Sequence, residues 1–558
     1  MKTIKPLLIS ISIIVLFSCS KEDCIEVDLI LTNANIYTGD ESNPKASTIG
    51  IKGKNIVFLS SDTSFNKNCG KTNIIDLSQS TVFPGFSDAH AHLKGIGYRE
   101  MTLNLQGINS LEDTLDTIKD YVIKTKKGDW VVGRGWIEKI WPEKRFPNKH
   151  DLDKFSPNNP VIIERADGHA VVANSFALQL AGIEIGTVDP QGGFIEKDEE
   201  GNPTGLLVDR ATYLVERLIP KNSKEKDKEA FLKGLKRYAS LGWTQIHVPG
   251  GDYRDIELLK EIKAEGNLVQ RIYFMVSDGE PATRLLQEGP TIDPDHFLTI
   301  RSIKMYADGA LGSRGAALID KYQDYEGKGV LIFLEEETIP KLEKALEVGI
   351  QIGTHAIGDL GNQITLDWYE RAFNAISEDQ RVISSPRWRI EHSQIITPED
   401  QNRFFELGVI PSMQPSHAIG DLHFAVDRLG MERINNAYVW RDLIDKGLII
   451  AGGSDAPVEI GDPRIEFYAA TSRKDLTGHY DDGWNLDQKV TREEALKMFT
   501  IWPAIAAFQE DIRGTLEVGK LADITVFDKD LMTIPEEEIM SAKNVLTILD
   551  GKIVFQDL

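Results

Sequence analysis

The architecture of this chain is best predicted from the stretch Phe83-Pro84-Gly85-Phe86-Ser87-Asp88-Ala89-His90-Ala91-His92. In an extended strand, side chains two residues apart point to the same face, so His90 and His92 are expected to project together from the end of the strand Thr81-Val82-Phe83. Two neutral imidazoles side by side form half of a metal site. Two of eleven histidines can fall at this spacing by chance, so the interpretation depends on partners elsewhere in the chain.

Apolar runs that resemble strands recur after this stretch and alternate with helical patterns, which is typical of a parallel α/β architecture. After the strand that ends near His92, seven further candidate strands are expected at 244–248, 271–276, 302–306, 352–355, 388–392, 409–414 and 448–455. Eight strand–helix repeats fit a (β/α)8 barrel of the TIM type, whose chemistry lies at the carboxyl ends of the strands.

Side chains of the types that bind metal ions lie on or at the ends of five of these strands. The six residues are His90 and His92 at strand one, Lys304 on strand four, His355 at strand five, His392 at strand six and Asp455 at strand eight. Core histidines placed by chance would not favour the same edge of every strand. The pattern therefore predicts a metal site at the mouth of the barrel rather than a set of buried polar groups that only satisfy one another.

The two ends of the chain predict a second, smaller domain. Short β-rich runs with turn residues cover 28–82 and recur at 514–558, so both ends are expected to form one composite β-sandwich. The barrel is then expected at 83–513. A long passage at about 95–220 has β-like runs of its own, at 130–136 and 161–165, and is predicted to be a subdomain inserted over the barrel mouth, where loops usually set specificity.

Length and charge limit the classes of partner. The chain has 558 residues, 41% of them hydrophobic, which suffices for one large barrel and one smaller domain. Its formal net charge of −23 argues against a nucleic-acid-binding surface, because phosphate backbones require clustered Lys and Arg. A small-molecule substrate is expected, and the choice between a monomer and a homo-oligomer stays open.

The N-terminus predicts export and lipid attachment. Lys2 and Lys5 precede an apolar run at 7–17 that is too short to span a bilayer, so residues 1–18 are expected to be a signal peptide. Leu16-Phe17-Ser18-Cys19 resembles a lipobox, which predicts that Cys19 is lipidated and that 19–27 form a tether. The membrane is then contacted only through this anchor.

Two features near the N-terminus leave alternatives open. Lys21-Glu22-Asp23 resembles the acidic export signal of some lipoproteins and is equally well explained as a solvated linker. The expected location is therefore the cell envelope, either periplasmic or exposed at the surface of the outer membrane. Cys24 and Cys69 would lie in an oxidising compartment, where they form either a disulfide or two separate thiols.

Five segments together resemble the amidohydrolase superfamily, and within it the YtcJ-like branch that includes N-substituted formamide deformylases. The matching segments are 84–92 (PGFSDAHAH), 304–316 (KMYADGALGSRGA), 355–359 (HAIGD), 391–394 (EHSQ) and 453–457 (GSDAP). The resemblance extends over nearly all of the chain from Val27 to Phe555. It implies a metal-dependent barrel with a composite β-sandwich, in agreement with the prediction from the strand pattern.

The resemblance also implies roles for the candidate residues. His90, His92 and Asp455 would hold one divalent ion, His355 and His392 a second, and a carbamylated Lys304 would bridge the two; zinc is the expected metal, bound as one ion or two. Hydroxide shared by the ions would attack a carbonyl carbon. Asp455 would take the proton from the attacking water and deliver it to the leaving amine.

Three further residues are candidates for substrate binding. His169 would donate to the substrate carbonyl or serve as an ordinary hydrogen-bonded loop histidine. His417 would line the pocket. Arg314 would bind an acidic substrate or, like Asp308, stabilise the loop after strand four. For His247 a packed core role is expected.

The predicted function is hydrolysis of an amide-type C–N bond in a small molecule. Deamination of a ring, or hydrolysis of an ester or lactone, would use the same ligands and is kept as an alternative. A surface-tethered binding or regulatory lipoprotein with a decayed site is the third, and the presence of all six ligand-type residues argues against it.

Overall fold

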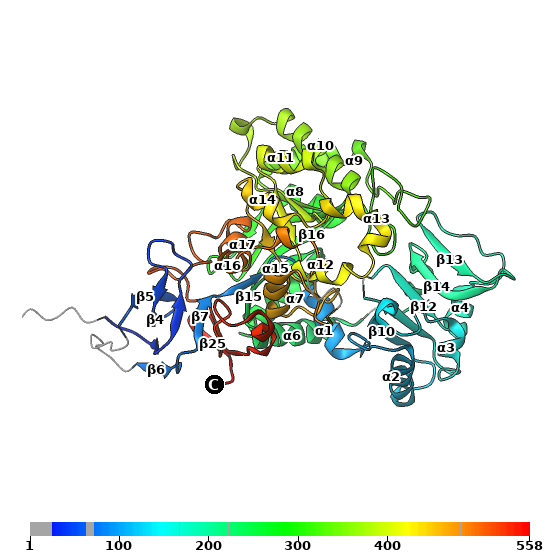
Figure 1. The fold of residues 1–558 in the computed structure, drawn as a ribbon, viewed down its shortest axis with the longest axis horizontal. Coiled ribbons are helices and arrows are strands. Elements are labelled where there is room, and N and C mark those ends of the chain that lie inside the picture. Colours follow the sequence, from blue (N-terminus) through cyan, green and yellow to red (C-terminus); the bar gives the residue numbers. More distant parts are fainter. Residues whose placement is uncertain (1–24, 63–71, 167, 221, 479–482) are drawn as a thin grey trace, which may run out of the picture.

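The structure is a computed structural model that describes residues 25–62, 72–166, 168–220, 222–478 and 483–558. The predicted signal peptide, Cys19, the acidic run at 21–23, Cys24 and Cys69 all lie outside these residues. No helix in the described ranges is both long and apolar enough to cross a membrane. Figure 1 shows a β-domain built from the blue and red chain ends at one side, a barrel in the centre and a cyan inserted domain at the opposite side.

The central domain is a nearly closed barrel of parallel strands, as predicted. Its strands follow one another around the sheet in chain order: β8 (Phe86–Asp88), β15 (Trp243–Pro249), β16 (Arg271–Ser277), β18 (Leu298–Tyr306), β19 (Gln351–Ala356), β20 (Arg389–His392), β21 (Ile410–Met413) and β22 (Ala451–Gly452). The backbone N–H of Ala89 donates to the carbonyl of Gly452 at 3.0 Å, which joins the ends of the first and last strands. A short strand, β17 (Thr291–Ile292), pairs antiparallel with β18 outside the ring.

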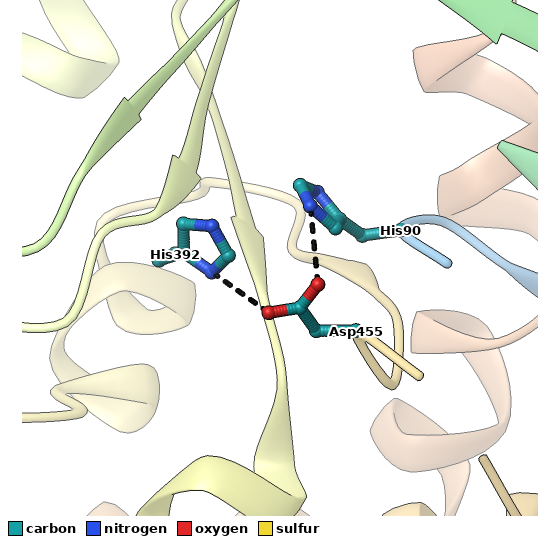
Figure 2. Close-up of side chains that lie close together, drawn as sticks. All are labelled: His90, His392 and Asp455. Atoms are coloured by element: carbon teal, nitrogen blue, oxygen red, sulfur yellow. Dashed lines mark ion pairs between the residues drawn. The ribbon is translucent and has the colours of Figure 1, made fainter. Parts of the chain in front are cut away.

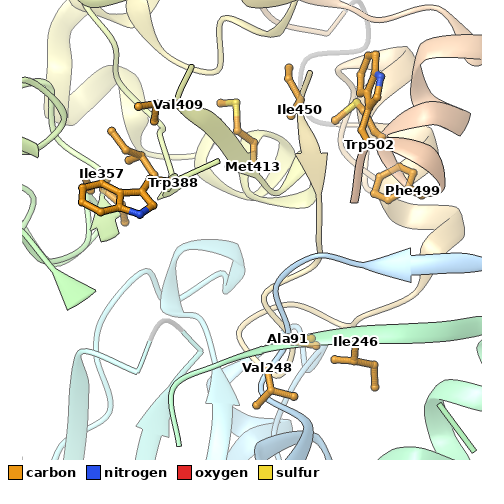
Figure 3. Packing of buried hydrophobic residues seen from close by; sticks show 14 of the residues in the cluster. Ala91, Ile246, Val248, Ile357, Trp388, Val409, Met413, Ile450, Phe499 and Trp502 are labelled. Atoms are coloured by element: carbon orange, nitrogen blue, oxygen red, sulfur yellow. The ribbon is translucent and has the colours of Figure 1, made fainter. Parts of the chain in front are cut away.

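Helices connect the strands and surround this barrel. They are α1 (Leu93–Met101), α6 (Lys224–Leu241), α7 (Tyr253–Ala264), α8 (Glu280–Glu288), α9 (Glu335–Val348), α10 (Asp359–Ala375), α11 (Pro398–Leu407), α12 (Pro415–Asp421), α13 (Ala425–Arg433), α14 (Trp440–Asp445), α15 (Pro463–Ser472), α16 (Arg492–Met498) and α17 (Ile501–Ala506). Strand β15 is covered on both faces and is buried at every position. Its sequence therefore does not alternate between buried apolar and exposed polar residues. Figure 3 shows this packing, with Ile246 and Val248 of β15 and Phe499 and Trp502 among the buried side chains.

The stretch before His90 forms two strands rather than one, which corrects the first prediction. Strand β7 (Thr81–Pro84) pairs with β2 and β23 of the small β-domain, and the barrel strand is the separate β8. The chain changes sheet at Gly85, where an added Cβ would lie 2.4 Å from the Thr244 hydroxyl, so only glycine fits this approach. His90 and His92 follow β8, and their ring centroids lie 5.7 Å apart.

The small domain is a β-sandwich made by both chain ends, as predicted. One sheet has the order β5-β4-β1-β6 and the other β25-β24-β23-β7-β2-β3. The strands are β1 (Leu29–Thr32), β2 (Asn35–Tyr37), β3 (Lys45–Ala46), β4 (Thr48–Lys52), β5 (Asn55–Ser60), β6 (Asn73–Asp76), β23 (Ile524–Phe527), β24 (Asn544–Leu549) and β25 (Lys552–Gln556). β7 and β23 pair antiparallel, with Val82 opposite Val526, and both residues belong to one buried cluster.

The segment between α1 and α6 folds around its own mixed sheet of order β13-β14-β12-β11-β10-β9. Its elements are β9 (Leu103–Asn104), α2 (Leu111–Lys124), β10 (Val131–Trp136), α3 (Lys149–Asp153), β11 (Val161–Arg165), β12 (Ala170–Ala173), α4 (Ser175–Ala181), β13 (Gly193–Lys197), β14 (Pro203–Asp209) and α5 (Tyr213–Glu216). Separate hydrophobic clusters bury its two faces, so this inserted domain has its own core. Residues from it, including Arg165 and His169, line the cavity at the barrel mouth.

Candidate metal centre

The carboxyl ends of strands one, six and eight bring three buried side chains together. The ligand atoms of His90, His392 and Asp455 all lie within 4.8 Å of one another. Figure 2 shows the Asp455 carboxylate between the two imidazoles, with Oδ1 3.5 Å from His90 Nε2 and Oδ2 4.0 Å from His392 Nδ1. Two imidazoles and a carboxylate form a donor set that suits zinc and similar ions.

The other predicted ligands surround this group. His92 Nε2 lies 3.2 Å from Asp455 Oδ1, and Lys304 Nζ lies 3.2 Å from His90 Nε2. The ring of His355 lies 4.5 Å from that of His392. All six predicted residues therefore meet at one end of the barrel.

The backbone is unusual at two of these positions. Asp455 and His392 adopt left-handed conformations, with φ of 57° and 74°. Such conformations in residues other than glycine cost free energy and gather at functional sites. Next to Asp455, Gly453 passes so near His90 that an added Cβ would lie 2.5 Å from the His90 backbone nitrogen. Local backbone geometry thus places the Asp455 side chain against the imidazoles.

A buried charge network orients His90. The Glu391 Oε2 atom lies 2.5 Å from His90 Nδ1 and accepts a hydrogen bond from Arg389 Nη2 at 2.9 Å. Burial alone would raise the pKa of Glu391, but the nearby Arg389 and His90 hold it far below its usual range, so Glu391 is a carboxylate that accepts the Nδ1 proton. The lone pair of His90 Nε2 consequently faces Asp455 and Lys304.

Sequence reasoning assigned no role to Glu391 or to Asp88. A signal for the first was present, since Arg389 and Glu391 are two charged residues of opposite sign on one face of a predicted buried strand. The carboxylate of Asp88 accepts hydrogen bonds from the backbone N–H groups of His90 and Ser454. It thereby joins the loop that carries His90 to the loop that carries Asp455.

Two glutamines select the protonated nitrogens of His392 and His417. His392 Nδ1 donates to Gln414 Oε1 at 2.8 Å, which leaves the lone pair of its Nε2 available. Gln394 Nε2 donates to His417 Nδ1 at 3.1 Å, so the His417 proton is on Nε2, 3.5 Å from Asp455 Oδ2. His417 therefore offers a hydrogen-bond donor at the mouth of the barrel rather than a lone pair.

His355 is held by the loop after strand four. Its Nε2 donates to the Gly309 carbonyl at 3.3 Å, which leaves the lone pair of Nδ1. The Asp308 carboxylate accepts from the backbone N–H groups of Ala317, Ile357 and Gly358. Asp308 thus stabilises this loop. The Lys304 ammonium instead contacts His90.

The surroundings set the charge states of the candidate ligands. Burial, with help from the Lys304 charge, lowers the pKa of His90 to about 4 and holds that of His355 well below its usual range. Burial lowers the pKa of Lys304 to about 8, against the opposing charges of Glu391 and Asp455. For Asp455, burial alone would raise the pKa, but His92, His90 and His392 hold it well below its ordinary value. Neutral imidazoles beside a carboxylate are the ionic forms that bind metal.

A buried carboxylate oxygen without a hydrogen-bond partner indicates a cation site. The buried Oδ1 atom of Asp455 makes no hydrogen bond within the described part of the chain, although two imidazoles lie near it. A buried carboxylate oxygen without a partner costs free energy. A divalent ion held by Asp455 and the lone pairs of its neighbouring histidines would satisfy it. The residues present therefore fit the metal that the strand pattern predicts.

A cavity of about 330 Å³ opens above this centre. Of the predicted substrate-binding residues, His169 and His417 line it, and His169 Nδ1 lies 2.9 Å from Asp209 Oδ1. Apolar side chains, among them Ile137, Leu311 and Phe424, cover much of the remaining wall. Arg314 does not line this cavity; it pairs with Asp324 at 2.8 Å and faces two neighbouring cavities. His247, as expected, lies in the core, where its Nδ1 accepts from Arg389 at 2.9 Å.

Comparison with known proteins identifies the family. The sequence profile described as "Amidohydrolase family" matches residues 73–555. The chain belongs to the amidohydrolase family. Within it, the chain is 32% identical over 529 residues to YtcJ of Bacillus subtilis, a protein named as an amidohydrolase, and the match covers 93% of this chain and 98% of YtcJ. It is 27% identical over 552 residues to the N-substituted formamide deformylase of Arthrobacter pascens, with 95% and 98% of the two chains covered.

Solved structures agree with the assignment of this chain to the amidohydrolase family. A protein of Pyrococcus horikoshii, described as an uncharacterized metal-dependent hydrolase, superimposes with a TM-score of 0.72 at 25% identity, with 91% of this chain and 99% of that chain covered. A Pyrococcus furiosus protein with the same description gives a TM-score of 0.70 at 26% identity, with coverage of 90% and 100%. The predicted fold and the family resemblance are confirmed.

Proposed function

We propose that this amidohydrolase hydrolyses an amide-type C–N bond of a small molecule with the help of a divalent metal ion, most simply zinc. The observation that carries the proposal is the ionised, incompletely satisfied Asp455 carboxylate among four histidines at the floor of the cavity. The name of the Arthrobacter relative, a deformylase of N-substituted formamides, favours a C–N bond.

His90, His392 and Asp455, whose ligand atoms lie within 4.8 Å of one another, would hold the first ion together with His92. This assignment moves His392 from the second ion, where the resemblance places it, to the first, and His355 with Lys304 would extend the site to a second. When bound, such an ion supplies Lewis acidity and lowers the pKa of water. Lys304 would serve as a carbamate, because an ammonium beside imidazole lone pairs would repel a divalent ion, whereas a carbamate supplies a bridging anion.

The protein's own groups would then move the proton and hold the substrate. Asp455, kept ionised by its histidine neighbours, would accept the proton of the attacking water and return it to the leaving nitrogen. The Nε2 proton of His417 points towards Asp455 and would donate to an oxygen of the substrate on which negative charge develops. His169, whose Nδ1 is held by Asp209, would present its Nε2 to the substrate from the inserted domain.

A panel of substrates tests the proposal. An N-alkyl formamide, an N-acyl amino acid, a heterocyclic amine and a lactone are offered to the protein before chelation, after chelation and after zinc is returned. Turnover of the first two alone, lost on chelation and restored by zinc, is expected. Faster release of ammonia from the heterocycle, or faster opening of the lactone, would move the function to deamination or ester hydrolysis. Binding without turnover across the panel by metal-replete protein would favour the binding lipoprotein.

We also propose that the enzyme works in the cell envelope, anchored through a lipid on Cys19. This proposal is supported only by the sequence of the N-terminal residues. Two positively charged residues, a short apolar run and Cys19 follow one another in the order expected of a lipoprotein signal. A lipid anchor attaches a protein to a membrane without a segment that crosses it.

A further inference from the structure

A second cavity of about 300 Å³ adjoins the catalytic cavity. Three residues, Lys139, Arg165 and Gly312, line both cavities. One wall of this adjoining cavity comes from the inserted domain and the other from residues 312–314 and α13 of the barrel. Figure 1 shows α13 on the side of the barrel that faces β13 and β14.

Cations outnumber acids among the residues that line the adjoining cavity. Its charged residues are the cations Lys139, Lys144, Arg165, Arg314 and Arg428 and the acids Glu138 and Glu196. This surplus opposes the charge of the whole chain, which is −23. Clefts lined by one sign of charge raise the local concentration of ligands of the opposite sign. The cavity therefore favours an anion.

Most of these cations already have a counter-ion. Arg165 Nε lies 2.9 Å from Glu138 Oε2, and Arg314 and Arg428 share Asp324. The exception between the two cavities is Lys139, whose ammonium makes no ion pair or hydrogen bond with any described residue. Lys139 is partly buried, whereas Lys144, which also has no such partner in the described ranges, is exposed to solvent. A partly desolvated ammonium without a counter-ion gains most from an incoming carboxylate.

The cavity that contains both the metal-centre residues and Lys139 is largely apolar. Ile137, Leu311 and Phe424 line it together with Lys139 and Asp455. A ligand that fits has a scissile group at one end, a hydrocarbon body in the middle and an anionic group at the other end. Apolar walls with a few placed polar groups are typical of cavities that orient a small ligand.

We propose that the substrate is an amide with a carboxylate tail, and that Lys139 binds this carboxylate where the two cavities meet. The inference rests on the proposed function and adds the substrate class to it. Lys139 is a specificity-determining residue in this proposal, because it contacts the substrate away from the bond that is cleaved.

Binding measurements test the inference separately from catalysis. The probes are 6-formamidohexanoate and its neutral carboxamide, which differ only in the charge of the tail, and their dissociation constants are measured by calorimetry at low salt. We expect the wild type to bind the acid about tenfold more tightly than the amide, as one charge-assisted contact would give. Lys139→Met should remove this preference, and Lys139→Arg should keep it.

A control variant separates local from general electrostatics. Lys124→Met removes the same charge from α2 of the inserted domain, where Lys124 is exposed and lines neither cavity. It should leave the preference intact. Equal binding of the two probes by the wild type, or an unchanged preference in Lys139→Met, would overturn the inference.

Turnover of the same pair distinguishes the two proposals. Hydrolysis of both probes with the preference confined to KM, and abolished by Lys139→Met, supports both. Hydrolysis of both probes at equal KM and kcat would overturn the carboxylate inference while leaving the hydrolase function in place. Preferential binding of the acid with no hydrolysis of either probe would instead support the anion site and contradict the proposed hydrolysis of a formamide.

Discussion

Glu391 Oε2 lies 2.5 Å from His90 Nδ1, and this contact between strand six and the loop after strand one fixes which nitrogen of His90 faces the candidate metal centre. The partner carboxylate of a ligand histidine is normally as important as the ligand itself, because it sets the tautomer and the orientation of the ring. Arg389 holds the carboxylate from the other side at 2.9 Å. Metal affinity in this protein should therefore depend on a residue that does not bind the metal.

We expect Glu391→Gln to lower zinc affinity about 10–100-fold, since a neutral amide oxygen stabilises the Nδ1 proton of His90 less than a carboxylate does. Affinity is measured by competition with a chromophoric chelator. Glu466→Gln is the matched control, because Glu466 is also fully buried but accepts from the Ser416 N–H and touches no candidate ligand. Equal zinc affinities for the two variants would contradict the positioning role of Glu391.

Asp455→Asn should leave a folded barrel with turnover reduced at least about 10²–10⁴-fold, because an amide cannot accept the proton of water. Turnover, zinc content and thermal unfolding are measured together. Asp421→Asn serves as control: Asp421 lines the same cavity but accepts from the Tyr438 hydroxyl. Activity of Asp455→Asn within a few-fold of the wild type would rule out its role as the proton acceptor.

Lys304→Ala should lose metal and activity, and acetate or propionate should restore part of both. The proposed carbamate forms when the neutral amine of Lys304 reacts with CO₂. The added carboxylate can occupy the position of this carbamate. Lys94→Ala is the control, since Lys94 also lies near the barrel mouth but pairs with Asp255 at 2.6 Å. Full metal content and activity without added carboxylate would show that Lys304 is no ligand.

Glu459 predicts a pH dependence of stability. Burial raises its pKa from 4.5 to about 8, and the charges of Asp421 and Asp455 add to the rise. The folded state therefore keeps a proton that the unfolded state releases, so the contribution of Glu459 to stability is present below pH 4.5 and is lost as pH rises towards 8. The slope is at most about 1.4 kcal/mol per pH unit.

Glu459→Gln removes this titration. Its melting temperature should rise relative to the wild type as the pH increases from 5 to 8, and the two proteins should converge at the acidic end. The comparison is made on metal-free protein, because a bound cation would lower the pKa of Glu459. A constant difference in melting temperature over this range would show that Glu459 does not titrate there.

Cys19→Ser should release the protein from the membrane fraction, because the serine cannot be acylated at the position that the lipobox predicts. Labelling with a fatty-acid analogue and fractionation measure the effect, and Cys24→Ser is the control. Continued labelling of Cys19→Ser would contradict the lipid anchor.

The barrel and its six candidate ligands could be predicted because buried parallel strands leave a strong local signal. His355 and His392 lie at or next to the carboxyl ends of β19 and β20, which are buried at every position. The break between β7 and β8 was missed because both strands are short and only one residue separates them, and only pairing with β23 shows that they belong to different sheets.

Contacts between distant strands had no local signal. The orientation of His90 by Glu391 depends on residues 301 positions apart, and the pairing of Arg314 with Asp324 depends on how the loop after strand four folds back. Lys139 carries no motif at all. Its position between two cavities follows from how the inserted domain docks on the barrel, which periodicity and residue spacing do not encode.

The antiparallel pairing of β7 with β23 also constrains biosynthesis. Val82 pairs with Val526, so the strand that leads directly into the barrel gains this neighbour only when nearly all of the chain has been made. Until β23 is made, the edge of β7 that pairs with it stays unpaired, and unpaired strand edges promote aggregation during synthesis. A chain truncated before Ile524 therefore lacks β23 and cannot complete the sandwich, even if all eight barrel strands are present.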